Sequence, residues 1–129
     1  MSVLDAAAPG ATFGPYQITI SREEAGRYAA AVGGTGSPSY GDAVPPLALV
    51  AAGLSRLIDS LGLAGGTVHA GQEAEFVRPV AVGESVTATA ELRASSVRRD
   101  SRFATVETVF TDRSGNVVAS SSSTIIVPA

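Results

Sequence analysis

The chain has 129 residues, with 12 acidic and 9 basic side chains and a formal net charge of −3. This length fits one domain of ordinary size, which can bury a core without disulfide staples. There is no cysteine and a single histidine, His69, so disulfides, thiolate metal centres, a cysteine nucleophile and a histidine-rich metal site are excluded, and no metal is expected. All nine basic residues are arginine, which excludes Schiff-base chemistry and a P-loop and makes nucleic acid a poor partner.

The sequence gives no sign of a membrane segment. The longest strongly apolar stretch, Val44 to Leu54, is too short to cross a bilayer. The first residues, Met1 to Asp5, lack the basic residues and the long apolar core of a signal peptide. We therefore expect a soluble cytoplasmic domain that does not contact a membrane.

The N-terminal third predicts a lead-in arm over residues 1–12, then a strand, then a helix. Pro15–Ile20 alternates apolar and polar residues, as a short strand does. Ser21 and Glu24 have the spacing of a capping box, which predicts that a helix begins here. That helix is expected to end near Val32, where two glycines follow. The next stretch, to residue 46, is rich in Gly, Pro, Ser and Thr and predicts a loop.

The segment Leu47–Leu61 is apolar around most of its circumference. Its polar residues form only a narrow stripe, whereas a helix on a protein surface has a wide polar face. The pattern predicts a helix buried on most sides, with Leu54, Leu57 and Ile58 almost wholly covered, and Gly62 ends it. The stripe consists of Ser55, Arg56, Asp59 and Ser60.

The second half of the chain predicts four long antiparallel strands. Their alternating β-branched patterns are longer than the usual five or six residues. Gly115 closes a hairpin turn that begins at Asp112, and the residues around Arg99 form a second connection. Such a meander must curl around the buried helix, which predicts an α+β fold with a curved antiparallel sheet of five to six strands. The expected strands are Val68–Val77, Ser85–Arg98, Arg102–Thr111 and Asn116–Val127.

Three stretches resemble the MaoC-like hydratases and dehydratases. The turn from Arg78 to Glu84, Arg-Pro-Val-Ala-Val-Gly-Glu, resembles the Arg-Pro-x-x-x-Gly-Asp turn of that family. The strand His69–Phe76 before it and the stretch Thr111–Ala119 are similar to the preceding strand and the last hairpin of the family. The resemblance covers roughly residues 13–127 and implies a single hot-dog domain over residues 1–129, with one long central helix.

The resemblance also implies a loss of catalytic groups. Active members hydrate or dehydrate acyl thioesters with an Asp-x-Asn-Pro-x-His loop, because the reaction needs a base for water and a proton donor for carbon. Here Thr35 and Tyr40 stand at the Asp and His positions, and neither is a base near neutral pH. Pro45 and Pro46 stand at the helix start, where a backbone N–H would polarise the thioester carbonyl, and proline has none. We expect no catalytic residue in this chain.

The loop that runs from Ser37 to the helix start resembles the degenerate halves of double hot-dog hydratases and heterodimeric dehydratases. That resemblance implies a non-catalytic subunit of an (R)-type enoyl-thioester hydratase or 3-hydroxyacyl-thioester dehydratase in fatty-acid or polyketide metabolism. Its ligand would be an acyl-CoA or acyl-carrier-protein thioester, and no cofactor is implied. It would form a heterodimer with a catalytic hot-dog chain, or otherwise a homodimer. The implied substrate-binding residues are Tyr40, Asp42, Pro46, Leu47 and His69.

Two other functions stay open from the sequence. A hot-dog thioesterase could use Glu73, Glu75 or Asp42 as base or nucleophile, and a homodimeric acyl-thioester binding module would need no chemistry. Each of these side chains also has an ordinary structural explanation: strand glutamates are commonly solvated, and loop aspartates commonly bind nearby backbone.

One basic concentration stands out near the connection between two predicted strands. Arg98 and Arg99, with Arg93 and Arg102 nearby, could meet the phosphates of coenzyme A or an acidic carrier protein. Arginines at a hairpin tip are also common for solubility alone.

Overall fold

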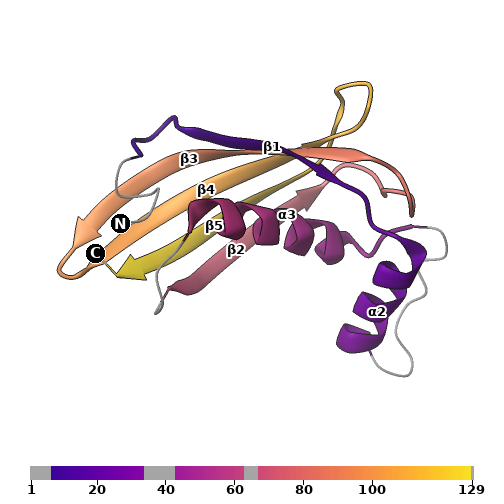
Figure 1. Cartoon of the computed structure of the whole chain (residues 1–129), viewed down its shortest axis with the longest axis horizontal. Coiled ribbons are helices and arrows are strands. Elements are labelled where there is room, and N and C mark those ends of the chain that lie inside the picture. The colour runs from indigo at the N-terminus through magenta and orange to yellow at the C-terminus, as the bar shows by residue number, and fades with distance from the viewer. Residues whose placement is uncertain (1–6, 34–42, 63–66, 129) are drawn as a thin grey trace.

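A computed structural model describes residues 7–33, 43–62 and 67–128 of the chain. Its strands form a single antiparallel sheet in the order β1-β3-β4-β5-β2, and the sheet curves around helix α3 (Figure 1). This is the α+β hot-dog architecture that the sequence predicts. The elements are β1 (Thr12–Ile18), α2 (Arg22–Gly33), α3 (Pro46–Leu61), β2 (Val68–Phe76), β3 (Val86–Arg98), β4 (Ser101–Thr111) and β5 (Val117–Pro128).

The predicted elements lie where the sequence places them, to within a few residues. The largest difference is at the N-terminus, where the sheet begins earlier than Pro15. Gly10 donates its N–H to the carbonyl of Leu92 at 2.8 Å, and Leu92 donates back to the carbonyl of Ala11 at 2.8 Å. The end of the expected lead-in arm therefore already pairs with β3 and extends the sheet.

Local signals fix the ends of the helices and the hairpin turn. The N–H of Glu24 donates to the Ser21 hydroxyl at 3.1 Å, and the N–H of Ser21 donates to the Glu24 carboxylate at 3.5 Å, so the capping box is confirmed. Gly62 ends α3 in the left-handed conformation with φ of 57°. Asp112 accepts the N–H groups of Ser114 and Asn116 and so closes the β4–β5 turn.

The two faces of the sheet differ in burial. On the inner face, toward α3, lie buried residues such as Val106 on β4 and Ile125 on β5. On the outer face lie the residues that alternate with them, such as Glu107 and Thr124, which are only partly covered. The core therefore sits between the inner face and α3.

Helix α3 lies close against the sheet at Gly53. A Cβ added there would lie 2.6 Å from the ring of Phe110, a side chain that is itself fully buried. Only glycine permits this approach, because Phe110 has no free space into which to move. One and two turns further along, Leu57 and Leu61 are fully buried against the same core.

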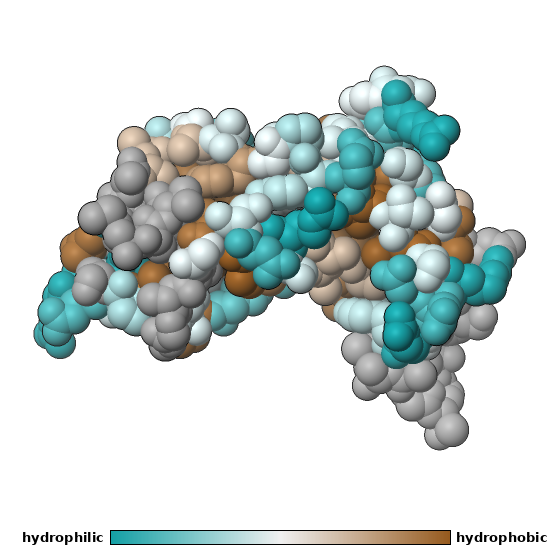
Figure 2. Space-filling model, viewed as in Figure 1, coloured by the Kyte–Doolittle hydropathy of each residue, from teal (hydrophilic) through white to brown (hydrophobic). Residues whose placement is uncertain are grey.

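The structure corrects the expectation that α3 is buried on most sides. Leu57 is fully buried as predicted, but Leu54 is only partly buried, Ile58 is 37% exposed and Leu47 is 55% exposed. With Ala51, these residues follow the i, i+4, i+7, i+11 spacing of one helix face. The periodicity identified apolar side chains correctly, but within the described part of the chain this face is only partly covered at Leu54 and is exposed at Ile58 and Leu47. Figure 2 shows the hydrophilic side chains over the middle of α3 with hydrophobic surface to either side.

We expect Leu57→Ala to lower the free energy of unfolding by about 2–5 kcal/mol, because it leaves a cavity beneath α3. Ile58→Ala is the matched control one residue away on the same helix, and it should cost well under half as much because its side chain is already in contact with solvent. Urea unfolding of the two variants measures both values, and equal costs would contradict this placement of the helix.

Candidate functional site

A cavity of about 270 Å³ opens between the start of α3 and the segment that follows β2. Its walls are almost entirely apolar, as in pockets that hold hydrocarbon groups. The two walls are joined directly, since the N–H of Val44 donates to the carbonyl of Val80 at 2.7 Å and Ala43 forms an isolated bridge with Ala81. The described lining residues are Ala43, Val44, Pro46, Leu49, Phe76, Val77, Arg78, Pro79 and Val80.

Arg78 is the ionisable residue of this described lining, and its guanidinium is held by two carboxylates. Nη1 and Nη2 donate to the two oxygens of Glu84 at 3.2 and 2.6 Å, which is a bidentate pair. Nη2 also donates to Asp112 at 3.1 Å. The arginine of the Arg-Pro turn thus ties the cavity wall to the β4–β5 hairpin.

The charges in this cluster stabilise one another. The pKa of Glu84 is lowered chiefly by its hydrogen bonds with Arg78 and next by the backbone N–H of Ala81. The pKa of Asp112 is lowered chiefly by the backbone N–H of Asn116 and next by Arg78. Conversely, the bonds to Glu84 and Asp112 raise the pKa of Arg78. Because the guanidinium is already engaged, this cluster serves to hold the wall in shape.

Of the predicted substrate-binding residues that the structure describes, Pro46, Leu47 and His69, only Pro46 is in the cavity lining. Pro46 lines the cavity as the first residue of α3, and with no N–H it leaves Leu47 as the first N–H donor of the helix. The Leu47 side chain is exposed beside the lining rather than part of it. Tyr40 and Asp42, like Thr35, lie outside the described residues.

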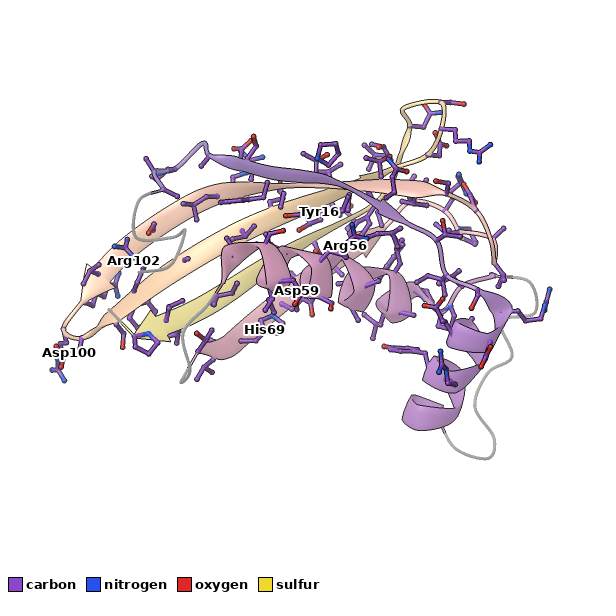
Figure 3. The ribbon with its side chains drawn as sticks, in the orientation of Figure 1. Tyr16, Arg56, Asp59, His69, Asp100 and Arg102 are labelled. Carbon is purple, nitrogen blue, oxygen red and sulfur yellow. The ribbon has the colours of Figure 1, made fainter. Side chains whose placement is uncertain are left out.

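His69 lies far from the cavity along β2. It lies near the beginning of the strand (Figure 3) and is exposed, whereas Phe76 at the strand's end lines the cavity. Seven residues of extended strand separate the two, roughly 23 Å. The role predicted for His69 in substrate binding therefore stays a prediction, and the described structure does not bring it together with Pro46.

The thioesterase candidates on β2 face away from α3. Glu73 pairs with Ser122 and Glu75 pairs with Ser120, residues on the outer face of β5. Both glutamates are exposed, and neither lines the cavity. They border a shallow polar depression of the outer face together with Glu107.

The arginines of the β3–β4 hairpin lie at the other end of the sheet. Arg98 stacks over the ring of Phe103, with its guanidinium carbon 5.7 Å from the ring centre. Arg99 takes a φ of 56° in the tight turn, and Arg102 donates to the Ser95 hydroxyl at 2.8 Å. Figure 3 shows Arg102 and Asp100 at this far end. The side chains of Arg98 and Arg102 are thus held by contacts within the hairpin.

Sequence reasoning missed most of the cavity lining. Leu49, Phe76 and Val77 carry no signal beyond their apolarity, and they come from segments nearly thirty residues apart. The exposure of Phe76 and Val77, 40% and 67%, is visible only in the folded chain. The one available signal was the Arg-Pro motif, which marks the wall but not its apolar partners.

This fold and cavity define a hot-dog domain of the hydratase and dehydratase type. The chain belongs to the family described as the FAS1-like dehydratase domain region, whose model matches residues 7–121. No curated protein matches the chain.

Solved structures share the fold at low sequence identity. A MaoC-like dehydratase from Rhodospirillum rubrum is 22% identical with a TM-score of 0.73, covering 97% of this chain and 95% of that one. The (R)-hydratase from A. caviae involved in PHA biosynthesis is 22% identical with a TM-score of 0.74, covering 95% and 98%. The HadBC complex of Mycobacterium tuberculosis, a 3R-hydroxyacyl-ACP dehydratase, is 18% identical with a TM-score of 0.71, covering 92% and 96%.

The helices of the described residues include none that is long and apolar enough to cross a membrane. Groups of three or more potential metal ligands are likewise absent from the described part of the chain.

The Arg78 cluster predicts a specific dependence of stability on pH. Because the pKa of Glu84 is lowered on folding, its contribution is present above the pKa of the unfolded chain and is lost as pH falls below about 4. We expect Glu84→Gln to be less stable than the wild type at pH 7, and the difference to shrink on acidification to pH 3. Glu23→Gln, which removes an exposed carboxylate on α2, is the control, and chemical unfolding across this pH range measures the effect. A difference that stays constant with pH would contradict the role given to the ion pair.

Proposed function

We propose that this chain is the acyl-thioester-binding subunit of an (R)-type enoyl-thioester hydratase or 3-hydroxyacyl-thioester dehydratase in the cytoplasm. It shapes the acyl pocket, and a second hot-dog chain supplies the base and the proton donor. Fatty-acid or polyketide metabolism would supply such a substrate, as an acyl-CoA or an acyl-carrier-protein thioester.

The observation that carries the proposal is the apolar cavity at the start of α3. It can enclose a hydrocarbon chain, and its described lining contains no carboxylate and no histidine that could act as a base. Its one ionisable lining residue, Arg78, is engaged by Glu84 and Asp112. An apolar pocket whose described lining offers no base fits a subunit that positions substrate for a partner.

Two further points support the proposal. Thr35 and Tyr40 stand where the family's loop has its Asp and His, so the sequence offers no acid–base pair there. The similar HadBC complex is a dehydratase of two different chains, which supports a role for this chain as one member of such a pair.

A thioesterase using Glu73 or Glu75 is the weaker alternative. Both carboxylates lie on the outer face of the sheet and the cavity opens on the inner side, so neither can reach a thioester whose acyl chain fills the cavity. The homodimeric binding module differs from the proposal only in its partner, and an activity measurement with two chains separates them.

We expect the purified chain to show no hydration of crotonyl-CoA or longer trans-2-enoyl-CoA above background, since acid–base groups contribute about 10²–10⁴ and an oxyanion donor about 10²–10³ to the rate. Thr35→Asp/Tyr40→His should recover little, because Pro46 still lacks an N–H. The loss of enoyl absorbance measures turnover. Robust turnover that disappears in His69→Ala would overturn the proposal and make His69 the base.

Binding of the acyl chain is tested separately from turnover. Ala43→Phe places a ring in the cavity and should weaken binding of a long-chain acyl-CoA by roughly tenfold or more, with little effect on butanoyl-CoA, because each methylene kept out of the pocket loses about 0.8 kcal/mol. Ala94→Phe, at an exposed position on β3, is the matched control. Titration calorimetry gives both affinities, and equal binding of long chains by wild type and Ala43→Phe would place the acyl site elsewhere.

A further inference from the structure

Strand β2 is an open edge of the sheet. It comes last in the strand order, and its nine residues are exposed without exception. Among the described residues it pairs only with β5. An open edge carries unpaired N–H and C=O groups, which form a template for a further strand.

The surface beside this edge is apolar. Phe76, on the inner face of β2 opposite Ala119, is 40% exposed, and Ile58 and Leu47 on α3 are exposed as well. Arg56 serves as a reference for the two sides of α3. Its guanidinium stacks on Tyr16 of β1, so Arg56 marks the side of the helix that faces β1, the edge strand opposite β2 (Figure 3).

Residues at positions i and i+2 of a helix are rotated by slightly more than half a turn about its axis. Ile58 therefore lies on the side of α3 that faces away from Arg56 and toward β2. The apolar stripe of α3 and Phe76 on the inner face of β2 therefore lie on the same uncovered side of the sheet. An edge strand that is protected against pairing with other chains is not expected to lie beside an exposed apolar surface, because such surfaces mark interaction sites.

The outer face of the same strand is acidic. Glu73 and Glu75 alternate there, and Glu73 lies in one row with Ser122 of β5 and Glu107 of β4. Glu107 is engaged by Arg93, whereas Glu73 and Glu75 have no ion pair within the described residues. The edge thus presents two unneutralised carboxylates directly beside its apolar surface.

These carboxylates oppose pairing between two copies of this chain. A twofold axis perpendicular to the sheet pairs the two β2 strands antiparallel and keeps their outer faces on the same side. The ladder of β2 is irregular between His69 and Gly71, so the regular part is Gly71–Phe76.

The outer faces match only if the twofold axis lies between a residue and its own copy on the other strand, since a one-residue slip turns every side chain to the other face. The two positions of the axis that best centre Gly71–Phe76 are level with Glu73 and with Ala74. The first sets Glu73 opposite its own copy, and the second sets Glu73 opposite Glu75 twice. Like charges directly opposite each other destabilise a strand pair.

We infer that the β2 edge selects a different hot-dog chain, whose edge strand carries arginine or lysine on its outer face, and selects against a second copy of this chain. The apolar surface of α3 and β2 supplies affinity, and the glutamate pair supplies the choice of partner. That the partner is the catalytic chain rests on the proposed function, whereas the charge selection is a property of this chain alone.

A charge swap tests the selection without any need for the natural partner. The variant Glu73→Arg/Glu75→Arg is mixed with wild-type chain, and native mass spectrometry with sedimentation separates homodimers from the mixed dimer. We expect the mixed dimer to form roughly tenfold more tightly than either homodimer, because like-charge pairs become opposite-charge pairs. The control Glu23→Arg/Asp100→Arg makes the same change in net charge on α2 and the β3–β4 turn, and it should leave association with wild type unchanged.

The neutral variant Glu73→Gln/Glu75→Gln gives a second readout if the arginine variant fails to fold. It should self-associate several-fold more tightly than wild type, because two repulsive pairs are removed. The inference is overturned if the mixed dimer is no tighter than the wild-type homodimer, or if the neutral variant associates no better than wild type. No thioester is present in these mixtures, so the association results do not depend on the proposed hydratase role. In the same way, a failure of the charge selection would leave the proposed hydratase role untouched.

Discussion

The close approach of α3 to the sheet at Gly53 is the constraint on which the rest of the structure depends. The absence of a Cβ lets the helix backbone lie against the ring of Phe110, and the buried faces of Leu57 and Leu61 follow from that contact. Arg56 then reaches β1, donating to the carbonyl of Gln17 at 3.0 Å. The helix is set toward the β1 side, so the β2 side of the inner face is left uncovered.

The cavity and the open edge are both consequences of this offset. Where the helix begins, its first turn meets the segment after β2 and leaves the apolar space between Leu49 and Phe76. Along the rest of β2 nothing in the described chain lies on the strand, and Ile58 remains exposed above it. The domain therefore has a pocket at one end of β2 and unpaired backbone groups along the open edge of the same strand. The proposed acyl site and the proposed interface with a partner thus lie next to each other.

The Arg78 cluster ties the cavity wall to the β4–β5 hairpin. A bidentate pair with Glu84 and a third bond to Asp112 connect the turn after β2 with the β4–β5 hairpin. Asp112 also closes its own hairpin through backbone N–H groups, so the anchor is itself held in place. An arginine that neutralises two carboxylates in this way shapes the wall and leaves the pocket apolar for an acyl chain.

The sequence by itself determined the secondary structure, because each signal is local: Ser21 and Glu24 cap a helix, Gly115 closes a hairpin, and β-branched alternation makes strands. It also determined the family, through motifs that are short and contiguous. It did not determine which apolar residues of α3 are covered, and the expectation for Ile58 was wrong, because periodicity records that a face is apolar but not what lies on it. The tertiary structure decided the cavity as well, since its walls meet through Val44 and Val80, residues whose contact depends on how the whole sheet curves around the helix.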